Sequence, residues 1–445
     1  MKLYKPEYVY QEGSFVSHMG LLTENGKISE IASYKELKQK YPMAREVIMD
    51  GEVMVPGTVN VHNHSFQSLL RGIAADRPFL EWRDESLYRY SQILTEEDIY
   101  NGAVFAFGEM MKRGVTCVSD FFYLHNYGIK SDEAIIRAAH DVGIRLVLAR
   151  TMYDWEGAPA GYVETINQAV DTTRVLAERY NKKEDSMVTI LPAPHSLHAA
   201  TPEMIQAGHA LAKELGTCFH IHVAEEPFEV EQVKKEHGGL TTIEYLDTLG
   251  VVDEHMVIIH GVWLKPEEIE LMGKRGAKLA YCPSSNMFLA DGITDIPKFV
   301  ESGVLIGLGS DGACSNNRIS IFEEMRMVSI LQKAKTCNAM CLNYQQAFDM
   351  GTKNGAHLLE LNTGELKAGK MADFVGINLR DLSMMPLSES LEQMLPNLVY
   401  SMEPTAVKTV VVNGRQTVLD GRLLTMTEET IGKKVKETLK RMQEI

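Results

Sequence analysis

The sequence predicts an α/β protein: a (β/α)₈ TIM barrel with a small β-sandwich domain built from both ends of the chain. We expect the barrel to span residues 53–364, because short β-rich apolar runs alternate with longer helical patterns between about residues 53 and 312, the rhythm of repeated βα units around a parallel sheet. Eight such runs are enough to close a barrel. We expect its strands at residues 54–61, 115–121, 144–149, 187–193, 218–223, 256–259, 278–281 and 305–308.

The two ends of the chain have a different pattern. Residues 1–52 contain short alternating strands with the turn signal Asn25-Gly26, and residues 365–424 resume that style around Asn413-Gly414. Because unpaired strand edges are unfavourable, we expect the two segments to form one composite β domain. Residues 425–445 should form a charged C-terminal helix.

Composition excludes several classes of partner. The formal net charge of the 445 residues is −15, which argues against nucleic acid because such binding depends on clustered Lys and Arg. No apolar stretch reaches the ~18–20 residues that a membrane-spanning helix requires. Six cysteines are scattered through the chain and fit a reducing compartment. We therefore expect a cytoplasmic protein, a homo-oligomer, that acts on a small molecule.

The first candidate site is His62-Asn63-His64 at the end of the first predicted barrel strand. Side chains alternate along a strand, so His62 and His64 point the same way and can hold one metal ion between them. Packed or hydrogen-bonded structural histidines would give the same pattern. The motif alone therefore leaves both interpretations open.

The second candidate site is His222 with Glu225, at the end of the fifth predicted strand. His222 lies nearest the catalytic rim, whereas His220 is deeper and should fill the barrel interior. Glu225 is placed as a base beside a ligand, although a solvated loop acid would look the same.

His260 ends the sixth predicted strand and Asp311 follows the eighth. Each could individually be a helix cap or a buried structural group. Together, the strand ends of a barrel converge at one mouth. His62, His64, His222 and Asp311 would there supply the nitrogen and oxygen donors that suit zinc or a similar first-row metal.

These residues, in this order, resemble the amidohydrolase superfamily, specifically its mononuclear deaminase branch, over essentially the whole chain. Binuclear members hold their metals through a carboxylated lysine after strand four, but residues 191–198 contain no lysine. The resemblance therefore implies one Zn²⁺ ion, with Fe²⁺ as the alternative.

The resemblance also implies a mechanism. The ion lowers the pKa of its bound water and supplies hydroxide at physiological pH. Asp311 would take the water proton, and Glu225 would protonate a substrate nitrogen and later the departing ammonia. His260 would polarise the attacking hydroxide and stabilise the tetrahedral intermediate.

Two resemblances compete over the substrate. Residues 69–76 and 310–317 resemble the methylthioadenosine and S-adenosylhomocysteine deaminases and the triazine hydrolases, which implies an aminated nitrogen heterocycle such as a nucleobase, nucleoside, pterin or triazine. Residues 64–67, 82–83, 122–125 and 195–198 instead resemble the N-formimino-L-glutamate deiminases. The substrate-binding positions of those deiminases correspond to Gln67, Arg83, Tyr123, His195 and His198.

The deiminases have an arginine where this chain has His198. A guanidinium clamps a carboxylate at any pH, whereas histidine offers one donor and is only partly charged near neutrality. We therefore predict a heterocycle deaminase, with a formimino-amino-acid deiminase as the alternative. Arg83 could also be an exposed ion-pair partner of Asp84 or Glu81. The same metal site would serve an amide or chloro-heterocycle hydrolase, or a non-catalytic metal-binding protein.

Overall fold

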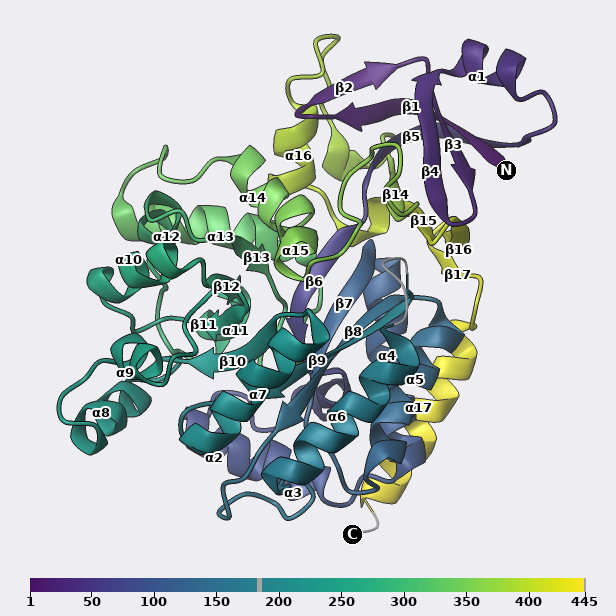
Figure 1. Ribbon diagram of the computed structural model, residues 1–445. Coiled ribbons are helices and arrows are strands. Elements are labelled where there is room, and N and C mark those ends of the chain that lie inside the picture. The colour runs from purple at the N-terminus through teal and green to yellow at the C-terminus, as the bar shows by residue number, and fades with distance from the viewer. Residues whose placement is uncertain (182–185, 444–445) are drawn as a thin grey trace.

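The computed structural model describes residues 1–181 and 186–443 (Figure 1). A mixed β-sheet lies at one end of the molecule, and the barrel strands with their surrounding helices form the larger part. One continuous buried apolar core extends through both parts.

Eight parallel strands form the barrel in two four-stranded halves, β6-β7-β8-β9 and β10-β11-β12-β13. Their side chains are almost entirely buried, which is typical of a parallel sheet covered by helices. The strands are β6 (Thr58–Asn63), β7 (Val115–Phe122), β8 (Arg145–Met152), β9 (Val188–Pro194), β10 (Phe219–Val223), β11 (Met256–His260), β12 (Lys278–Tyr281) and β13 (Ile306–Leu308).

The two halves meet where site residues lie. The backbone N–H of His222 donates to the carbonyl of His195 at 2.9 Å, joining β10 to the end of β9. The backbone N–H of Asp311 donates to the carbonyl of His62 at 3.0 Å, joining the end of β13 to β6. The regular ladder of strand-to-strand hydrogen bonds is thus interrupted between β9 and β10 and between β13 and β6. At both places, the backbone hydrogen bonds that connect the two halves involve candidate site residues.

Helices alternate with the barrel strands, as the sequence predicts, and local signals set their ends. Threonine side chains cap the starts of three long helices, while Gly143, Gly216 and Gly276 end helices in the left-handed conformation. The helices are α4 (Glu96–Lys112), α5 (Ile129–Val142), α6 (Ile166–Tyr180), α7 (Pro202–Leu215), α8 (Pro227–Glu236), α9 (Thr242–Thr248), α10 (Pro266–Arg275), α11 (Pro283–Phe288), α12 (Ile296–Glu301), α13 (Ile321–Thr336), α14 (Tyr344–Met350) and α15 (Lys353–Leu358).

The segment between β6 and α4 contributes short helical turns beside the barrel mouth, at the lower end of Figure 1. Trp82 anchors this segment, because its indole N–H donates to the carbonyl of Cys314 at 3.0 Å. The turns are a 3-10 helix (Ser65–Leu70), α2 (Phe79–Trp82), a π-helix (Arg83–Tyr88) and α3 (Arg89–Ser91).

Strands from both ends of the chain share one nine-stranded mixed sheet, with β5 and β14 paired antiparallel at the junction. The Asn25-Gly26 and Asn413-Gly414 pairs both have positive φ, as the predicted tight turns require. The strands are β1 (Lys2–Gln11), β2 (Ser14–Ser17), β3 (Met19–Glu24), β4 (Lys27–Ser33), β5 (Arg45–Pro56), β14 (Phe374–Asn378), β15 (Val407–Val412), β16 (Arg415–Leu419) and β17 (Arg422–Leu423). The accompanying helices are α1 (Tyr34–Lys40) and α16 (Met394–Tyr400).

The first barrel strand begins later than the sequence predicts. Residues 54–56 belong to β5 of the mixed sheet, and β6 begins at Thr58. Gly57 separates the two strands, and a side chain there would collide with that of Thr116. A single apolar run in the sequence thus serves two sheets, because a glycine allows the backbone to pass close to the neighbouring strand.

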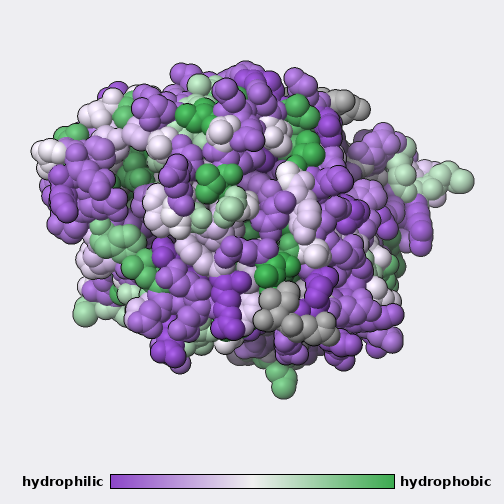
Figure 2. Space-filling view, turned by 90° about the horizontal axis from the view of Figure 1, so that it is seen from below, coloured by the Kyte–Doolittle hydropathy of each residue, from purple (hydrophilic) through white to green (hydrophobic). Residues whose placement is uncertain are grey.

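The C-terminal helix α17 (Glu428–Gln443) packs along α4, as the yellow and blue helices of Figure 1 show. Asn101 donates to the hydroxyl of Thr438 at 3.1 Å, and that hydroxyl donates to Asp98 at 2.8 Å. Among the described residues, no helix is long and apolar enough to cross a bilayer. The face in Figure 2 shows small apolar patches among mainly hydrophilic residues.

A buried ion pair connects the barrel to the mixed sheet. Arg145 at the start of β8 donates to both carboxylate oxygens of Asp373, at 2.9 and 3.2 Å. Thr363 and the backbone of Asn413 also donate to Asp373, at 2.8 and 2.6 Å. One buried carboxylate therefore holds segments from both parts of the molecule.

We predict that Asp373→Ala costs about 3–5 kcal/mol of stability, because it leaves the buried Arg145 charge without this partner. Thermal unfolding should show a clearly lower midpoint. Asp50→Ala is the matched control, since Asp50 pairs with Arg380 on the surface and exposed pairs contribute little. Equal unfolding midpoints for the two variants would contradict the role assigned to Asp373.

Candidate active site

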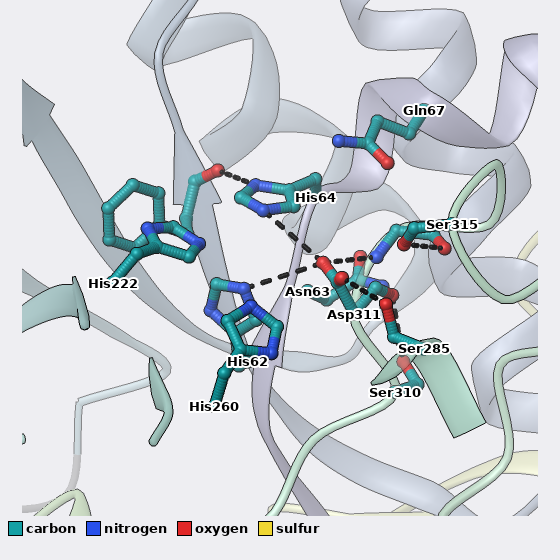
Figure 3. A network of polar contacts seen from close by, with 12 residues as sticks. His62, Asn63, His64, Gln67, His222, His260, Ser285, Ser310, Asp311 and Ser315 are labelled. Carbon is teal, nitrogen blue, oxygen red and sulfur yellow. Dashed lines mark hydrogen bonds and ion pairs between the residues drawn. The ribbon is translucent and has the colours of Figure 1, made fainter. Parts of the chain in front are cut away.

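Four histidines and one aspartate meet in a buried cluster at the carboxyl ends of the barrel strands (Figure 3). One histidine lies on β6 and another directly follows that strand. Strands β10 and β11 each supply one further histidine, and the aspartate follows β13. None of the five is more than 5% exposed. The cluster consists of His62, His64, His222, His260 and Asp311.

Asp311 lies at the centre of this cluster. Its Oδ1 is 3.5 Å from Nε2 of His62 and 3.3 Å from Nε2 of His64. Ser285 donates to its Oδ2 at 2.6 Å and the backbone N–H of Gly312 donates to its Oδ1 at 2.7 Å. Burial acts to raise the pKa of Asp311, but the neighbouring histidines outweigh it and hold that pKa well below its usual value. The carboxylate is therefore ionised.

Backbone carbonyls orient two of the histidines. Nδ1 of His64 lies 2.6 Å from the carbonyl of Phe121, and Nδ1 of His222 lies 2.9 Å from the carbonyl of His195. A nitrogen that faces a carbonyl must carry the hydrogen, which leaves the lone pair on Nε2. Both rings therefore present an acceptor nitrogen towards the cluster.

The donor set fits a divalent metal ion. Donor atoms of His62, His64 and Asp311 lie within 4.8 Å of one another, as do those of His62, His222 and His260. Nδ1 of the fully buried His62 has no hydrogen-bond partner among the described residues, and its Nε2 has only the 3.5 Å contact with Asp311. Such orphaned polar atoms are costly unless a ligand satisfies them. Imidazole nitrogens with one carboxylate are the donors that zinc and similar metals prefer.

Glu225 lies beside this cluster, just after β10. Its Oε1 is 3.3 Å from Nε2 of His260, and the residue is 6% exposed. Burial, reinforced by the nearby Asp291 and Glu229 carboxyl groups, raises the pKa of Glu225 well above its ordinary value. Glu225 can thus carry a proton at neutral pH, which a general acid requires.

His260 has a partner that the sequence did not indicate. Asn286 Nδ2 lies 3.0 Å from Nδ1 of His260 and donates to Oδ2 of Asp291 at 2.9 Å. Burial lowers the pKa of His260 to about 3, so its ring is neutral. Neither Asn286 nor Ser285 forms part of a recognisable ligand motif, and only the folded chain places them beside the cluster.

A cavity of about 70 Å³ opens onto the cluster. All five substrate-binding residues predicted from the sequence line it: Gln67, Arg83, Tyr123, His195 and His198. The sequence analysis missed its aromatic walls, which come mostly from the turns after β6 and from the loop after β8: Phe79, Trp82, Tyr88, Tyr153 and Tyr162.

Several of the predicted residues already have partners. Gln67 donates to the hydroxyl of Tyr123 at 3.0 Å and accepts from Cys314 at 3.2 Å. Arg83 donates to Asp84 at 2.8 Å and its guanidinium lies 4.5 Å from the ring centre of Tyr88. The alternative of an ion pair with Asp84 is thus observed, although Arg83 also faces the cavity.

His198 lies on the cavity wall next to Glu229. Its Nδ1 is 3.4 Å from Oε1 of Glu229, a residue that the sequence analysis did not single out. Burial lowers the pKa of His198 to about 4, and the Arg83 charge adds to this effect. His198 is therefore uncharged near neutral pH and gives the cavity no second permanent cation.

Comparison with known proteins places this geometry in a family. The model described as "Amidohydrolase family" matches residues 53–417. The chain belongs to the amidohydrolase family. This amidohydrolase is 31% identical over 440 residues to a 5-methylthioadenosine/S-adenosylhomocysteine deaminase of Desulforamulus reducens, covering 98% of this chain and 96% of the relative. It is 33% identical over 385 residues to a 5'-deoxyadenosine deaminase of Methanosphaera stadtmanae, covering 86% of each.

Solved structures share the amidohydrolase fold. An adenosine deaminase from Xanthomonas campestris with bound zinc superposes with a TM-score of 0.92 at 24% identity, covering 100% of this chain and 98% of that one. An atrazine chlorohydrolase from Arthrobacter aurescens complexed with zinc gives 0.89 at 21% identity, covering 98% and 99%. The predicted TIM-barrel fold is confirmed.

Asp120 on β7 supports the loop that carries His64. It accepts from the backbone N–H and the hydroxyl of Ser65, both at 2.7 Å. We predict that Asp120→Ala weakens Zn²⁺ binding by ~10–100-fold, the usual cost of losing a group that orients a ligand. Competition against a chelating dye would measure it.

Ser119→Ala is the matched control for this prediction. Ser119 is the neighbouring buried residue, and its hydroxyl has no hydrogen-bond partner among the residues that the structure describes. Its Zn²⁺ affinity should equal that of the parent. A folded Asp120→Ala protein with parental affinity would show that Asp120 does not position His64.

Proposed function

We propose that this amidohydrolase is a metal-dependent hydrolytic deaminase that releases ammonia from an aminated nitrogen heterocycle. It is a hydrolase acting on carbon–nitrogen bonds other than peptide bonds. The observation that carries the proposal is the buried Glu225, which can hold a proton 3.3 Å from His260 and beside a cluster fitted for a metal ion. A general acid next to a source of nucleophilic water is what displacement of an amine requires.

We propose His62, His64, His222 and Asp311 as the metal ligands. One Zn²⁺ ion is the favoured occupant, with Fe²⁺ as the alternative; relatives of the same fold are described with bound zinc. When bound, such an ion lowers the pKa of water and so supplies a nucleophile near neutral pH. The poorly satisfied ring nitrogens of His62 and the carbonyl-bound Nδ1 atoms of His64 and His222 support this assignment.

The chain's own residues supply the proton transfers. Asp311, ionised and held by Ser285, accepts a proton from the attacking water. Glu225 donates a proton to a ring nitrogen of the substrate, which makes the adjacent carbon more electrophilic. The proton that Asp311 took from water then passes through Glu225, which lies in the same group as Asp311, to the departing ammonia. The hydroxyl proton of the tetrahedral carbon returns to Glu225 as the carbonyl forms, so both carboxyl groups regain their starting states. His260 donates from Nε2 to the developing tetrahedral oxygen.

A planar heterocycle suits the cavity best. Aromatic side chains line it, and an aromatic ring packs favourably against such walls. The two relatives described above are named as a 5'-deoxyadenosine deaminase and a 5-methylthioadenosine/S-adenosylhomocysteine deaminase. The Gln67 amide, the Tyr123 hydroxyl and the His195 ring are then the groups available to bind ring nitrogens.

A formimino-amino-acid deiminase is the second candidate function. Arg83 favours it, because its guanidinium could hold a substrate carboxylate. The neutral His198 weighs against a dicarboxylate such as formiminoglutamate, since a second buried carboxylate would lack a permanent cation opposite it. The metal site itself does not dictate the leaving group, so hydrolysis of an amide or a chloro-heterocycle is a further alternative.

We also propose a cellular location and an oligomeric state. The acidic net charge of −15 and the absence of disulfides among the described cysteines are compatible with a cytoplasmic protein. We further propose that the chain forms a homo-oligomer, which size-exclusion chromatography with light scattering would test.

The deciding experiment is a release screen of the purified, zinc-loaded protein. Ammonia and chloride would be measured against purines, pterins, adenosine derivatives, amino- and chlorotriazines and formimino-amino acids. The proposal expects ammonia from at least one aminated heterocycle with kcat/KM above ~10⁴ M⁻¹s⁻¹. Turnover confined to formimino acids, or chloride release alone, would instead support one of the alternatives.

We predict that Glu225→Gln keeps its metal content and loses at least ~10²-fold in kcat, because it removes the proton donor without removing a ligand. Steady-state kinetics and elemental analysis would measure both. Glu231→Gln is the matched control, since that carboxyl group lies exposed on α8, pairs with Lys234 and does not line the cavity. Activity of Glu225→Gln within a few-fold of the parent would remove Glu225 from the mechanism.

We also predict that His198→Arg impairs turnover of the heterocycle and raises activity towards formimino acids. The substitution adds a permanent cation beside Arg83, which favours a carboxylate and disfavours a neutral ring. Comparison of kcat/KM for the two substrate classes is the measurement. An unchanged ratio would show that residue 198 does not set the substrate class.

A further inference from the structure

His260 could serve either of two roles in this cluster. Its donor atom lies within 4.8 Å of those of His62 and His222, so the geometry would allow it to bind a metal ion. It also belongs to a second group with Glu225 and Asp311, on the side where the substrate and the attacking water must lie. Strand position alone therefore does not decide between a metal ligand and a hydrogen-bond donor.

Asn286 on α11 supplies the deciding contact. Its side chain is fully buried, and its Nδ2 donates to Nδ1 of His260 at 3.0 Å and to Oδ2 of Asp291 at 2.9 Å. The amide nitrogen has two hydrogens, and these two acceptors use both of them. Asp291 therefore fixes which end of the amide faces His260.

The position of Asp291 is itself fixed by the surrounding backbone. Its N–H donates to the carbonyl of Asn286 at 2.9 Å, and its own carbonyl accepts from the indole of Trp263 at 2.8 Å. Asp291 is 1% exposed. Burial raises the pKa of Asp291 to about 9, and its hydrogen bond to Glu226 adds to this effect. Because Asp291 directs its proton to Glu226, its Oδ2 remains an acceptor, which the Nδ2 end of the Asn286 amide can satisfy and the oxygen end cannot.

A neutral imidazole has one N–H group. Because Nδ1 of His260 accepts from Asn286, the hydrogen must be on Nε2. A protonated Nε2 has no lone pair for a metal ion but can donate to Glu225, 3.3 Å away, or to an oxygen in the same place. The hydrogen bond made by Nδ1 thus determines whether Nε2 acts as a donor or as a metal ligand.

We propose that Asn286, held by Asp291, is a positioning residue that keeps His260 in the Nε2–H tautomer and so excludes it from the metal. Helix α11 then serves two site residues at once, since the adjacent Ser285 donates to Asp311. The consequence for catalysis rests on the proposed function, whereas the tautomer does not depend on any substrate.

The first test measures the tautomer directly. Two-bond ¹H–¹⁵N correlation spectra of the full-length protein, labelled with ¹⁵N-histidine, distinguish the two neutral forms, and the His260→Asn spectrum assigns the signals. The parent should show His260 protonated on Nε2 in both the metal-free and the Zn²⁺-loaded protein. In Asn286→Asp the new carboxylate accepts from Nδ1, so the hydrogen should move to that nitrogen.

Asn286→Leu removes both donors, and Met287→Leu is the matched control at an exposed position of the same helix. Asn286→Asp and Asn286→Leu should each lower kcat at least ~10-fold with KM within ~3-fold, at unchanged metal content. The visible spectrum of Co²⁺-loaded Asn286→Asp should differ from the parent, because Nε2 of His260 can then bind the ion. Met287→Leu should match the parent in all three measurements.

The proposal is overturned if His260 of the parent is protonated on Nδ1, or if Asn286→Asp leaves the tautomer unchanged. It is also overturned if kcat falls only in proportion to lost metal or lost fold, as a purely structural residue would cause. Failure of the proposed function has a different signature, because the spectra would still show the Nε2–H tautomer while no heterocycle releases ammonia.

Discussion

The structure depends on the cost of burying several ionisable side chains in one place. His62, His64, His222 and Asp311 are nearly inaccessible to solvent, and an unpaired buried polar group costs about 1–3 kcal/mol. The convergence of strand ends at a barrel mouth creates this cluster. Hydrogen bonds from the surrounding backbone and side chains, together with a bound metal ion, would offset this cost. The site therefore needs both.

The hydrogen bonds that orient these side chains come from several strands and one helix. Carbonyls at the ends of β7 and β9 orient His64 and His222, and the side chains of α11 orient Asp311 and His260. The contacts between the two barrel halves also pass through the backbones of His222 and Asp311. The same residues thus complete the fold and form the site.

The sequence predicts the parts of the molecule that follow local rules. Alternation of side chains along a strand places His62 and His64 together, and turn chemistry places Asn25-Gly26 and Asn413-Gly414 between strands. It does not predict Asn286, Ser285 or Glu229, because their relation to the site exists only through tertiary contacts. The assignment of residues 54–56 was wrong for a similar reason, since only packing against Thr116 shows that Gly57 divides the run.

We propose that His62, His64, His222 and Asp311 together hold one metal ion, while His260 faces the water. A crystal structure of the zinc-loaded protein, with anomalous data collected on both sides of the zinc absorption edge, tests it most directly. The account predicts one anomalous peak per chain, ~2.0–2.2 Å from the three histidine nitrogens and the nearer carboxylate oxygen, with His260 outside bonding distance. Two peaks per chain, or a direct bond from His260 to the ion, would contradict it.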